Sequence, residues 1–313
     1  MGTYIARRAL LVIPLVWAVV TLVFVVVHLV PGNPAEVLLG PFATGAREKI
    51  LLREWGLTRP LWVQYLTYLR NVATGNFGVS YLTGEPAATQ ILQLFPYSFE
   101  LALAAMIIAV GVGTPLGILA ARRQGTAFDH GALVLAMLLV SVPDFFLGLV
   151  LLLVFSSALG WLPPIGDGSF SQPLSLLAHT VLPATALSSG LMAYIARMTR
   201  TSMLGALRED YIRTARAKGV APTAVVYRHA LRNAMVPVLS IVGIGAGQVI
   251  GGAVVIEIVF ARPGLGTLLV NSVTGRDYIQ VQACVIVLAC IFVIINLIVD
   301  VLYAVLDPRI QYA

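Results

Sequence analysis

One polar stretch lies between two long hydrophobic spans of the chain: Glu209-Asp210-Tyr211-Ile212-Arg213-Thr214-Ala215-Arg216-Ala217-Lys218-Gly219. Its residues favour a helix, and Gly219 predicts where that helix stops, because glycine takes the left-handed conformation of a helix end without penalty. The chain is 59% hydrophobic and only 11% charged. A segment with two acids and three bases must therefore face water. We interpret it as a docking surface for another protein and not as a catalytic site.

The rest of the chain is apolar enough to place it among multi-pass membrane proteins, with a mean hydropathy of +0.92. A helix needs about 20 apolar residues to cross the hydrocarbon core, where no water satisfies backbone groups. Six segments meet that test. They predict an all-α membrane protein with six transmembrane helices, at residues 9–30, 99–121, 131–159, 180–199, 236–260 and 283–306.

The basic residues indicate how the spans are oriented. An even number of spans puts both termini on one side of the membrane. In the short loops, Lys and Arg gather on that side, at residues 7–8, 122–123 and 197–232. The positive-inside rule makes this side cytoplasmic, so both termini are predicted to be cytoplasmic. The net charge of +6 then suits anionic lipid headgroups, and we expect no nucleic-acid partner.

We expect a single transmembrane domain over residues 1–313, with an extracytoplasmic layer at 31–97 and a cytoplasmic coupling region at 200–233. Apolar and aromatic residues recur at helical spacing in the outer layer and predict a helix on the outer surface, at Leu61, Trp62, Tyr65, Leu66 and Leu69. This layer either seals the mouth of the bundle or also receives a soluble partner. Turn chemistry predicts another outer loop at 262–266 and a helix break at Pro222.

The coupling region, together with His229-Ala230-Leu231-Arg232-Asn233-Ala234-Met235-Val236-Pro237, closely resembles the coupling loop of ABC importer permeases of the dipeptide, oligopeptide and nickel type. The resemblance covers nearly the whole chain. It includes Pro31-Gly32-Asn33-Pro34, Gly75-Asn76-Phe77-Gly78-Val79-Ser80, Pro263-Gly264-Leu265-Gly266, Arg276-Asp277-Tyr278, Asn296-Leu297-Ile298-Val299-Asp300 and Asp307-Pro308-Arg309.

One short segment departs from the general permease signature, which has Glu-Ala-Ala four residues before its glycine. This chain has Arg213, Thr214 and Ala215 there. The loop of the subfamily resembles the present one, so the departure leaves the subfamily assignment intact. The departure leaves open which side chains of this chain contact the ATPase.

The resemblance implies a type I ABC importer permease of a prokaryotic cytoplasmic (inner) membrane. It implies a heterodimer with a homologous second permease, two cytoplasmic ATPase subunits and an extracytoplasmic substrate-binding protein. The chain is not expected to be an enzyme, since a P-loop needs a lysine directly after glycine and neither Lys49 nor Lys218 follows one. ATP and Mg would bind the partner ATPases. The expected ATPase-coupling residues are Glu209, Asp210, Tyr211, Arg213, Thr214, Ala215, Arg216, Ala217, Lys218 and Gly219.

Acidic residues inside spans are costly and are therefore candidates for the substrate pathway, here Asp144, Glu257 and Asp300. Asp144 is the strongest, because it follows Pro143 within a span, where a broken backbone and a carboxylate would line a water-filled cavity. It would favour a cationic group such as a peptide amino terminus. No metal site is expected, as Cys284 and Cys290 lie six residues apart, on different helix faces.

Two other classes compete with the importer. A secondary transporter or channel, not driven by ATP, would also have six spans and buried acids but would not need a coupling helix. An intramembrane enzyme would need a constellation such as His-Glu-x-x-His, and none of the four histidines lies in that motif. The cargo stays open among dipeptides, longer peptides, glutathione-like molecules, and nickel or metal chelates.

Overall fold

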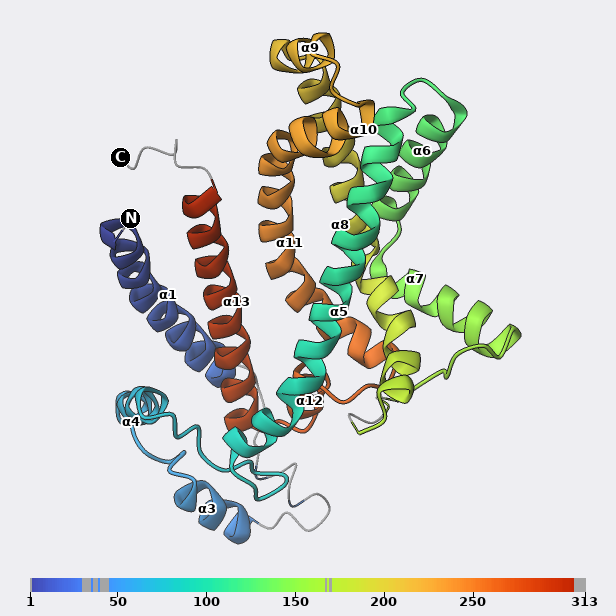
Figure 1. Cartoon of the computed structure of the whole chain (residues 1–313). Helices are drawn as coiled ribbons and strands as arrows, with labels where there is room; N and C mark the ends of the chain where they lie inside the picture. Colours follow the sequence, from blue (N-terminus) through green and yellow to red (C-terminus); the bar gives the residue numbers. More distant parts are fainter. Residues whose placement is uncertain are drawn as a thin grey trace. The chain divides into compact units, whose positions relative to one another are not determined.

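The structure, a computed structural model, describes residues 2–29, 35, 39, 45–166, 168 and 171–306 (Figure 1). Side chains within 2–9, at 300 and within 302–306 lie outside the description. The motifs at 31–34 and 307–309 fall outside the described residues as well. The described part is almost entirely helical, with one isolated bridge between Val79 and Pro86.

The chain forms two compact units. Of the described residues, the first unit contains those within 99–262 and 295–306, and the second contains those within 2–98 and 263–294. Two helices, α5 (Ala87–Arg122) and α13 (Tyr278–Leu306), are each divided between the two units. The helices of the first unit are α5 (Ala87–Arg122), α6 (Ala127–Ser141), α7 (Asp144–Leu151), α8 (Pro173–Leu207), α9 (Asp210–Ala217), α10 (Pro222–Ala224), α11 (Leu231–Val259) and the end of α13 (Tyr278–Leu306).

Five described helices are long and apolar enough to cross a membrane, and a sixth span results if α6 and the segment after it are counted together. The prediction of six apolar spans is confirmed in that sense. The third span, expected as one helix over 131–159, is instead bent by 105° between Ser141 and Asp144. Pro143 causes the break, because it lacks an N–H and forces Val142 before it into an extended conformation, with ψ of 125°. The π-helical turn Leu152–Ala158 continues α7.

Two local predictions are corrected. Leu265 and Gly266, expected in an outer loop, begin α12 (Leu265–Thr274). Pro222, expected to break the chain, is the first residue of α10, which continues through the π-helical turn Val225–Ala230 into α11. Proline is well tolerated at a first helical position, because the N–H that it lacks would have no partner there.

The core of the first unit lies where α5, α8 and α11 pack together, around Leu101, Ile195 and Ile256, which are fully buried. A buried arginine closes one end of this core. Arg262 donates to the Glu100 carboxylate from Nη2 at 2.6 Å and to the backbone oxygen of His179 from Nη1 at 2.9 Å. This pairing satisfies a charge that would otherwise be expensive to bury.

The second unit contains α1 (Gly2–Leu29), α3 (Gly45–Glu54), α4 (Leu61–Ala73), α12 and most of α13. The predicted helix at Leu61–Leu69 is confirmed as α4, whose Trp62 is exposed.

A buried Asp277 accepts a hydrogen bond from the Ser80 hydroxyl and holds the turn after α4. Trp55 stacks on Tyr81 with ring centroids 4.0 Å apart. Burial, aided by Asp277, raises the pKa of the Tyr81 phenol, which therefore stays neutral.

Candidate coupling site and translocation pathway

The polar stretch singled out in the sequence forms α9, at one end of the first unit beyond α8 and α11 (Figure 1). Glu209 is its N-cap and Lys218 its C-cap. Gly219 follows with φ of +77°, the left-handed conformation expected of a residue that ends a helix. The predicted helix and its glycine stop are both confirmed.

The two faces of α9 differ sharply. Ile212 is 0% exposed and Ala215 is 9% exposed, and both pack into an apolar cluster with the ends of α5 and α8 and the start of α11. The other residues expected to contact an ATPase are exposed: Glu209, Asp210, Tyr211, Arg213, Thr214, Arg216, Ala217, Lys218 and Gly219. Ala215, which was also expected to contact an ATPase, is instead buried and helps to anchor α9 to the rest of the first unit. The exposed face is free to contact another protein.

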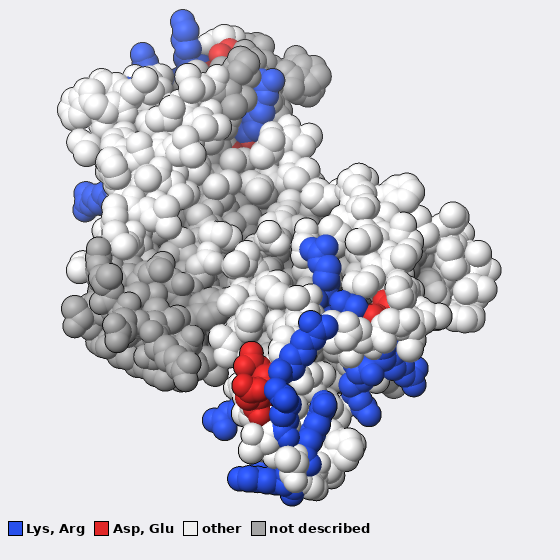
Figure 2. Space-filling view, turned by 90° about the horizontal axis from the view of Figure 1, so that it is seen from above, with Lys and Arg blue, Asp and Glu red and all other residues white. Residues whose placement is uncertain are grey.

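Local polar contacts stiffen this segment. Arg213 lies 3.1 Å from Asp210, one turn earlier, although both side chains stay largely exposed, at 77% and 93%. Asn233, near the start of α11, donates to the Tyr211 hydroxyl at 2.9 Å. Figure 2 looks onto the end of the first unit that carries α9 and shows Lys and Arg gathered there beside a small acidic patch. A partner whose surface has the complementary charges can bind such a mixed charge pattern.

Asp144 stands at the bend, as the first residue of α7. Its carboxylate accepts a hydrogen bond from the Ser189 hydroxyl of α8 at 3.1 Å. The carboxylate also lies beside two glycines, since a Cβ at Gly190 of α8 or Gly252 of α11 would be 3.7 or 3.9 Å from its oxygens. Asp144 is only partly buried. The carboxylate therefore lies at a broken backbone between α7, α8 and α11 of the first unit. The expected break next to Asp144 is present, and its role in a substrate pathway stays a prediction.

The other two acidic candidates lie elsewhere. Glu257 is buried near the end of α11, where its backbone oxygen accepts from the Arg262 N–H at 2.8 Å. Asp300 lies in α13, but its side chain is outside the described part of the chain. Among the described residues, no group of three or more His, Cys, Asp or Glu is arranged to hold a metal ion.

Two family descriptions match this chain. Residues 113–312 match the binding-protein-dependent transport system inner membrane component, and residues 1–102 match the N-terminal part of such membrane components. This chain belongs to that family. Its members are permease subunits, and the chain is accordingly a multi-pass transmembrane subunit of an inner-membrane ABC importer and not the ATPase.

Individual relatives of this permease match it over its full length. It is 40% identical over 333 residues to the dipeptide transport system permease protein DppB of Alkalihalophilus pseudofirmus, with 100% of both chains covered. It is 40% identical over 337 residues to the di/tripeptide permease DppB of Pseudomonas aeruginosa, covering 100% of this chain and 99% of that one. It is 41% identical over 312 residues to the glutathione permease GsiC of Escherichia coli, with 100% of both covered.

A solved structure supports the fold of the permease. A chain of the inward-facing MetNI methionine ABC transporter superposes with a TM-score of 0.53 at 17% identity, covering 69% of this chain and 96% of that chain. At that identity the likeness concerns the fold alone. The expected type I importer fold is confirmed.

Sequence reasoning about the permease missed the residue that anchors α9. Ile212 is the one residue of 209–219 outside the set expected to contact an ATPase, and it is the most deeply buried residue of α9. The spacing of Ile212 and Ala215, three residues apart on an otherwise polar helix, was the available signal of an inward face.

Proposed function

We propose that the chain forms half of the substrate pathway of an ATP-driven importer of peptides or related small solutes, the other half being a homologous second permease. The division of α9 into an exposed polar face and a buried apolar face carries this proposal. A helix that is polar outside and anchored inside can receive a force from one protein and pass it to another. A secondary transporter or channel has no use for such a helix.

In this mechanism, two cytoplasmic ATPase subunits bind ATP and Mg and present a groove to the exposed face of α9. When they close, α9 moves with them. Ile212 and Ala215 pack against α5, α8 and α11, so the movement reaches these helices as a rigid-body displacement. The ATPase must bind α9 differently in its two states, because equal binding would shift no equilibrium.

We assign the basic end of the first unit, with α9, to the cytoplasm on the basis of its arginines. By the order of the spans along the sequence, the segment 31–97 would be extracytoplasmic, where we propose that it receives a substrate-binding protein. We propose that the whole chain, residues 1–313, acts as a single permease domain.

We propose that Asp144 contributes the substrate-facing charge of the pathway. The Asp144 carboxylate is only partly buried and lies beside the backbones of Gly190 and Gly252, which place no side chain against it. It would attract the amino terminus of a peptide. We favour peptides over nickel or metal chelates, since the relatives described above are named for dipeptides, di/tripeptides and glutathione. Glu257 and Asp300 remain weaker candidates for the same pathway.

Transport by the purified complex in proteoliposomes tests the proposal. The complex is isolated from native membranes, reconstituted with its binding protein outside and ATP-Mg inside, and given a radiolabelled dipeptide. We expect uptake only with hydrolysable ATP, and none with an unhydrolysable analogue or with an imposed proton or sodium gradient. Uptake driven by a gradient in the absence of ATP would show a secondary transporter instead.

A further inference from the structure

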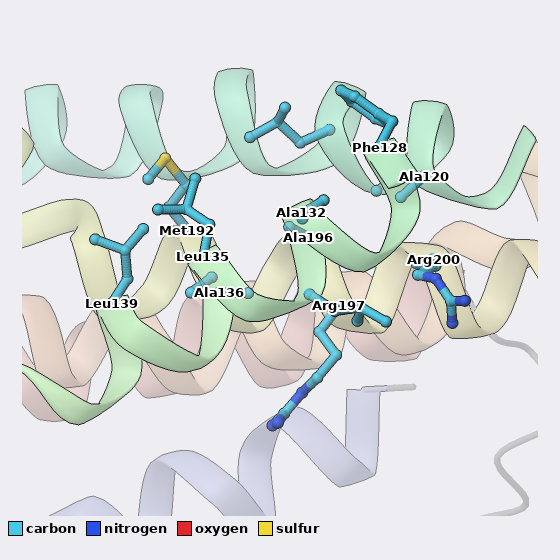
Figure 3. Close-up of a pocket in the computed structure, with 15 residues that line it drawn as sticks. Ala120, Phe128, Ala132, Leu135, Ala136, Leu139, Met192, Ala196, Arg197 and Arg200 are labelled. Atoms are coloured by element: carbon cyan, nitrogen blue, oxygen red, sulfur yellow. The ribbon is translucent and has the colours of Figure 1, made fainter. Parts of the chain in front are cut away.

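A cavity of about 290 Å³ lies in the first unit among α5, α6 and α8 (Figure 3). Its walls are apolar and largely made of small residues, among them Gly117, Ala132, Ala136 and Ala196. Larger apolar side chains such as Leu135 and Leu139 complete one side. Apart from Arg197 and Arg200 at its edge, the lining is apolar and suits a hydrocarbon chain.

The small residues explain why the space exists. Gly117 lets α5 approach α8 so closely that a Cβ there would lie 2.4 Å from the backbone oxygen of Ala196. Along α6, by contrast, Ala132 and Ala136 face the cavity with a single methyl group each, so the gap between α6 and α8 is not filled. All three helices belong to candidate membrane spans, so a lipid chain is a suitable occupant for an apolar opening between them.

Two arginines line the cavity, and a third contacts one of the lining residues. Arg200 lines it but is neutralised by Asp129. Arg197 also lines it, and Figure 3 shows its side chain extending away from the apolar groups. Arg123 lies with Cζ 5.4 Å from the ring centroid of Phe128, another lining residue. Within the described part of the chain, neither Arg197 nor Arg123 makes an ion pair, and both are exposed.

We propose that this cavity binds an anionic phospholipid of the cytoplasmic leaflet. One acyl chain fills the apolar cavity, and the phosphate is bound by the exposed arginines beside it, Arg197 or Arg123. Basic residues at the cytoplasmic edge of transmembrane helices attract anionic headgroups, at about 1 kcal/mol for each Lys or Arg. The proposal rests on the cytoplasmic assignment of this end, which the proposed function shares, but it needs neither an ATPase nor a cargo.

The test measures lipid retained by the importer complex. The tagged chain is purified with its bound subunits from native membranes and exchanged into nanodiscs of phosphatidylcholine with 20 mol% phosphatidylglycerol, about one lipid in five. Photo-activatable phosphatidylglycerol is then crosslinked, and the labelled peptide is mapped by mass spectrometry. Wild type is compared with Arg123→Gln/Arg197→Gln, which removes the headgroup contacts, and with Ala132→Phe, which fills the cavity.

Two matched controls use the same substitutions outside the cavity. Arg228→Gln/Arg232→Gln removes two exposed arginines from the same basic end, and Leu138→Phe enlarges an exposed side chain on α6 that does not line the cavity. Each variant is first shown to keep the thermal stability of wild type within a few degrees. The cavity-filling variant keeps the proposal testable if the arginine variant is unstable.

We expect the label on residues 116–139 and 192–200 of wild type. Crosslinking should fall at least about 5-fold in Arg123→Gln/Arg197→Gln, since each contact of about 1 kcal/mol contributes about 5-fold. It should fall by a comparable factor in Ala132→Phe and stay unchanged in both controls. Equal labelling of all variants would overturn the proposal. So would equal labelling by photo-activatable phosphatidylcholine, or crosslinking of this cavity to another subunit in place of lipid.

Discussion

Arg200 of α8 donates two hydrogen bonds to the Asp129 carboxylate of α6, from Nε at 2.5 Å and from Nη2 at 2.7 Å. Asp129 also accepts from the backbone N–H of Gly125 at 3.0 Å, and its side chain is only 2% exposed. The pair therefore joins the loop between α5 and α6 to α8 shortly before α8 leads into α9. A bidentate pair of this kind fixes both distance and angle.

Asp129→Asn should destabilise the chain by about 3 to 5 kcal/mol, because it leaves a mostly buried Arg200 without its counter-charge. Thermal unfolding in one detergent, followed by size-exclusion fluorescence, measures the loss. Asp210→Asn is the matched control, because it makes the same change in an exposed pair and should alter the melting temperature little. Equal shifts in the two variants would contradict the structural role given to Asp129.

Gly117→Ala should cost about 1 to 3 kcal/mol, because its new methyl group would lie 2.4 Å from the Ala196 backbone oxygen and force α5 away from α8. Gly111→Ala, on the same helix, meets nothing within 4 Å and should be neutral or slightly stabilising. The same unfolding assay compares them. If Gly111→Ala were the more damaging of the two, the close approach of α5 to α8 would be wrong.

Ile212→Ala should uncouple ATP hydrolysis from transport. It removes the buried anchor of α9 while leaving the exposed face intact, so the ATPase still binds but its closure moves the bundle less. The number of peptides imported per ATP hydrolysed should fall several-fold. Ile13→Ala, the same change at an exposed side chain of α1, should keep that ratio near wild type.

Asp144→Asn should reduce the preference for substrates with a cationic amino terminus. The uptake of a dipeptide is compared with that of its N-acetylated form, and their ratio should fall toward unity, as the attracting charge is lost. Ser189→Ala removes the hydrogen bond to the carboxylate but keeps its charge, so it should change the ratio less. An unaltered preference in Asp144→Asn would exclude this residue from the substrate site.

Much of the fold could be predicted because each span is a long apolar run. The ends were less predictable. The second span begins at Ala87 and not at 99, because packing in the second unit buries polar side chains such as Gln90, which donates to Thr83. The break at Pro143 follows from its chemistry, but the 105° bend depends on neighbours of α7, such as Phe260 beside Gly148.

For the candidate site, the positions of α9 and Asp144 could be predicted from the sequence, but their contacts could not. Exposed charges and a glycine stop located α9, and Pro143 made Asp144 stand out. Pairs that join distant parts of the chain, such as Asp129 with Arg200 and Glu100 with Arg262, were not predictable. Such pairs depend on which helices become neighbours, and the pattern of a single sequence does not specify this.

The most direct test of the coupling claim is the recovery of ATPase subunits with the tagged chain. The chain is purified from native membranes in mild detergent, its partners are identified by mass spectrometry, and ATPase activity is measured in the eluate. We predict that wild type recovers a second six-span permease and P-loop subunits. Asp210→Arg/Arg213→Glu should keep the permease and lose the P-loop subunits. Recovery of wild type without any ATPase, or undiminished ATPase with the charge-reversed variant, would contradict a coupling role for α9.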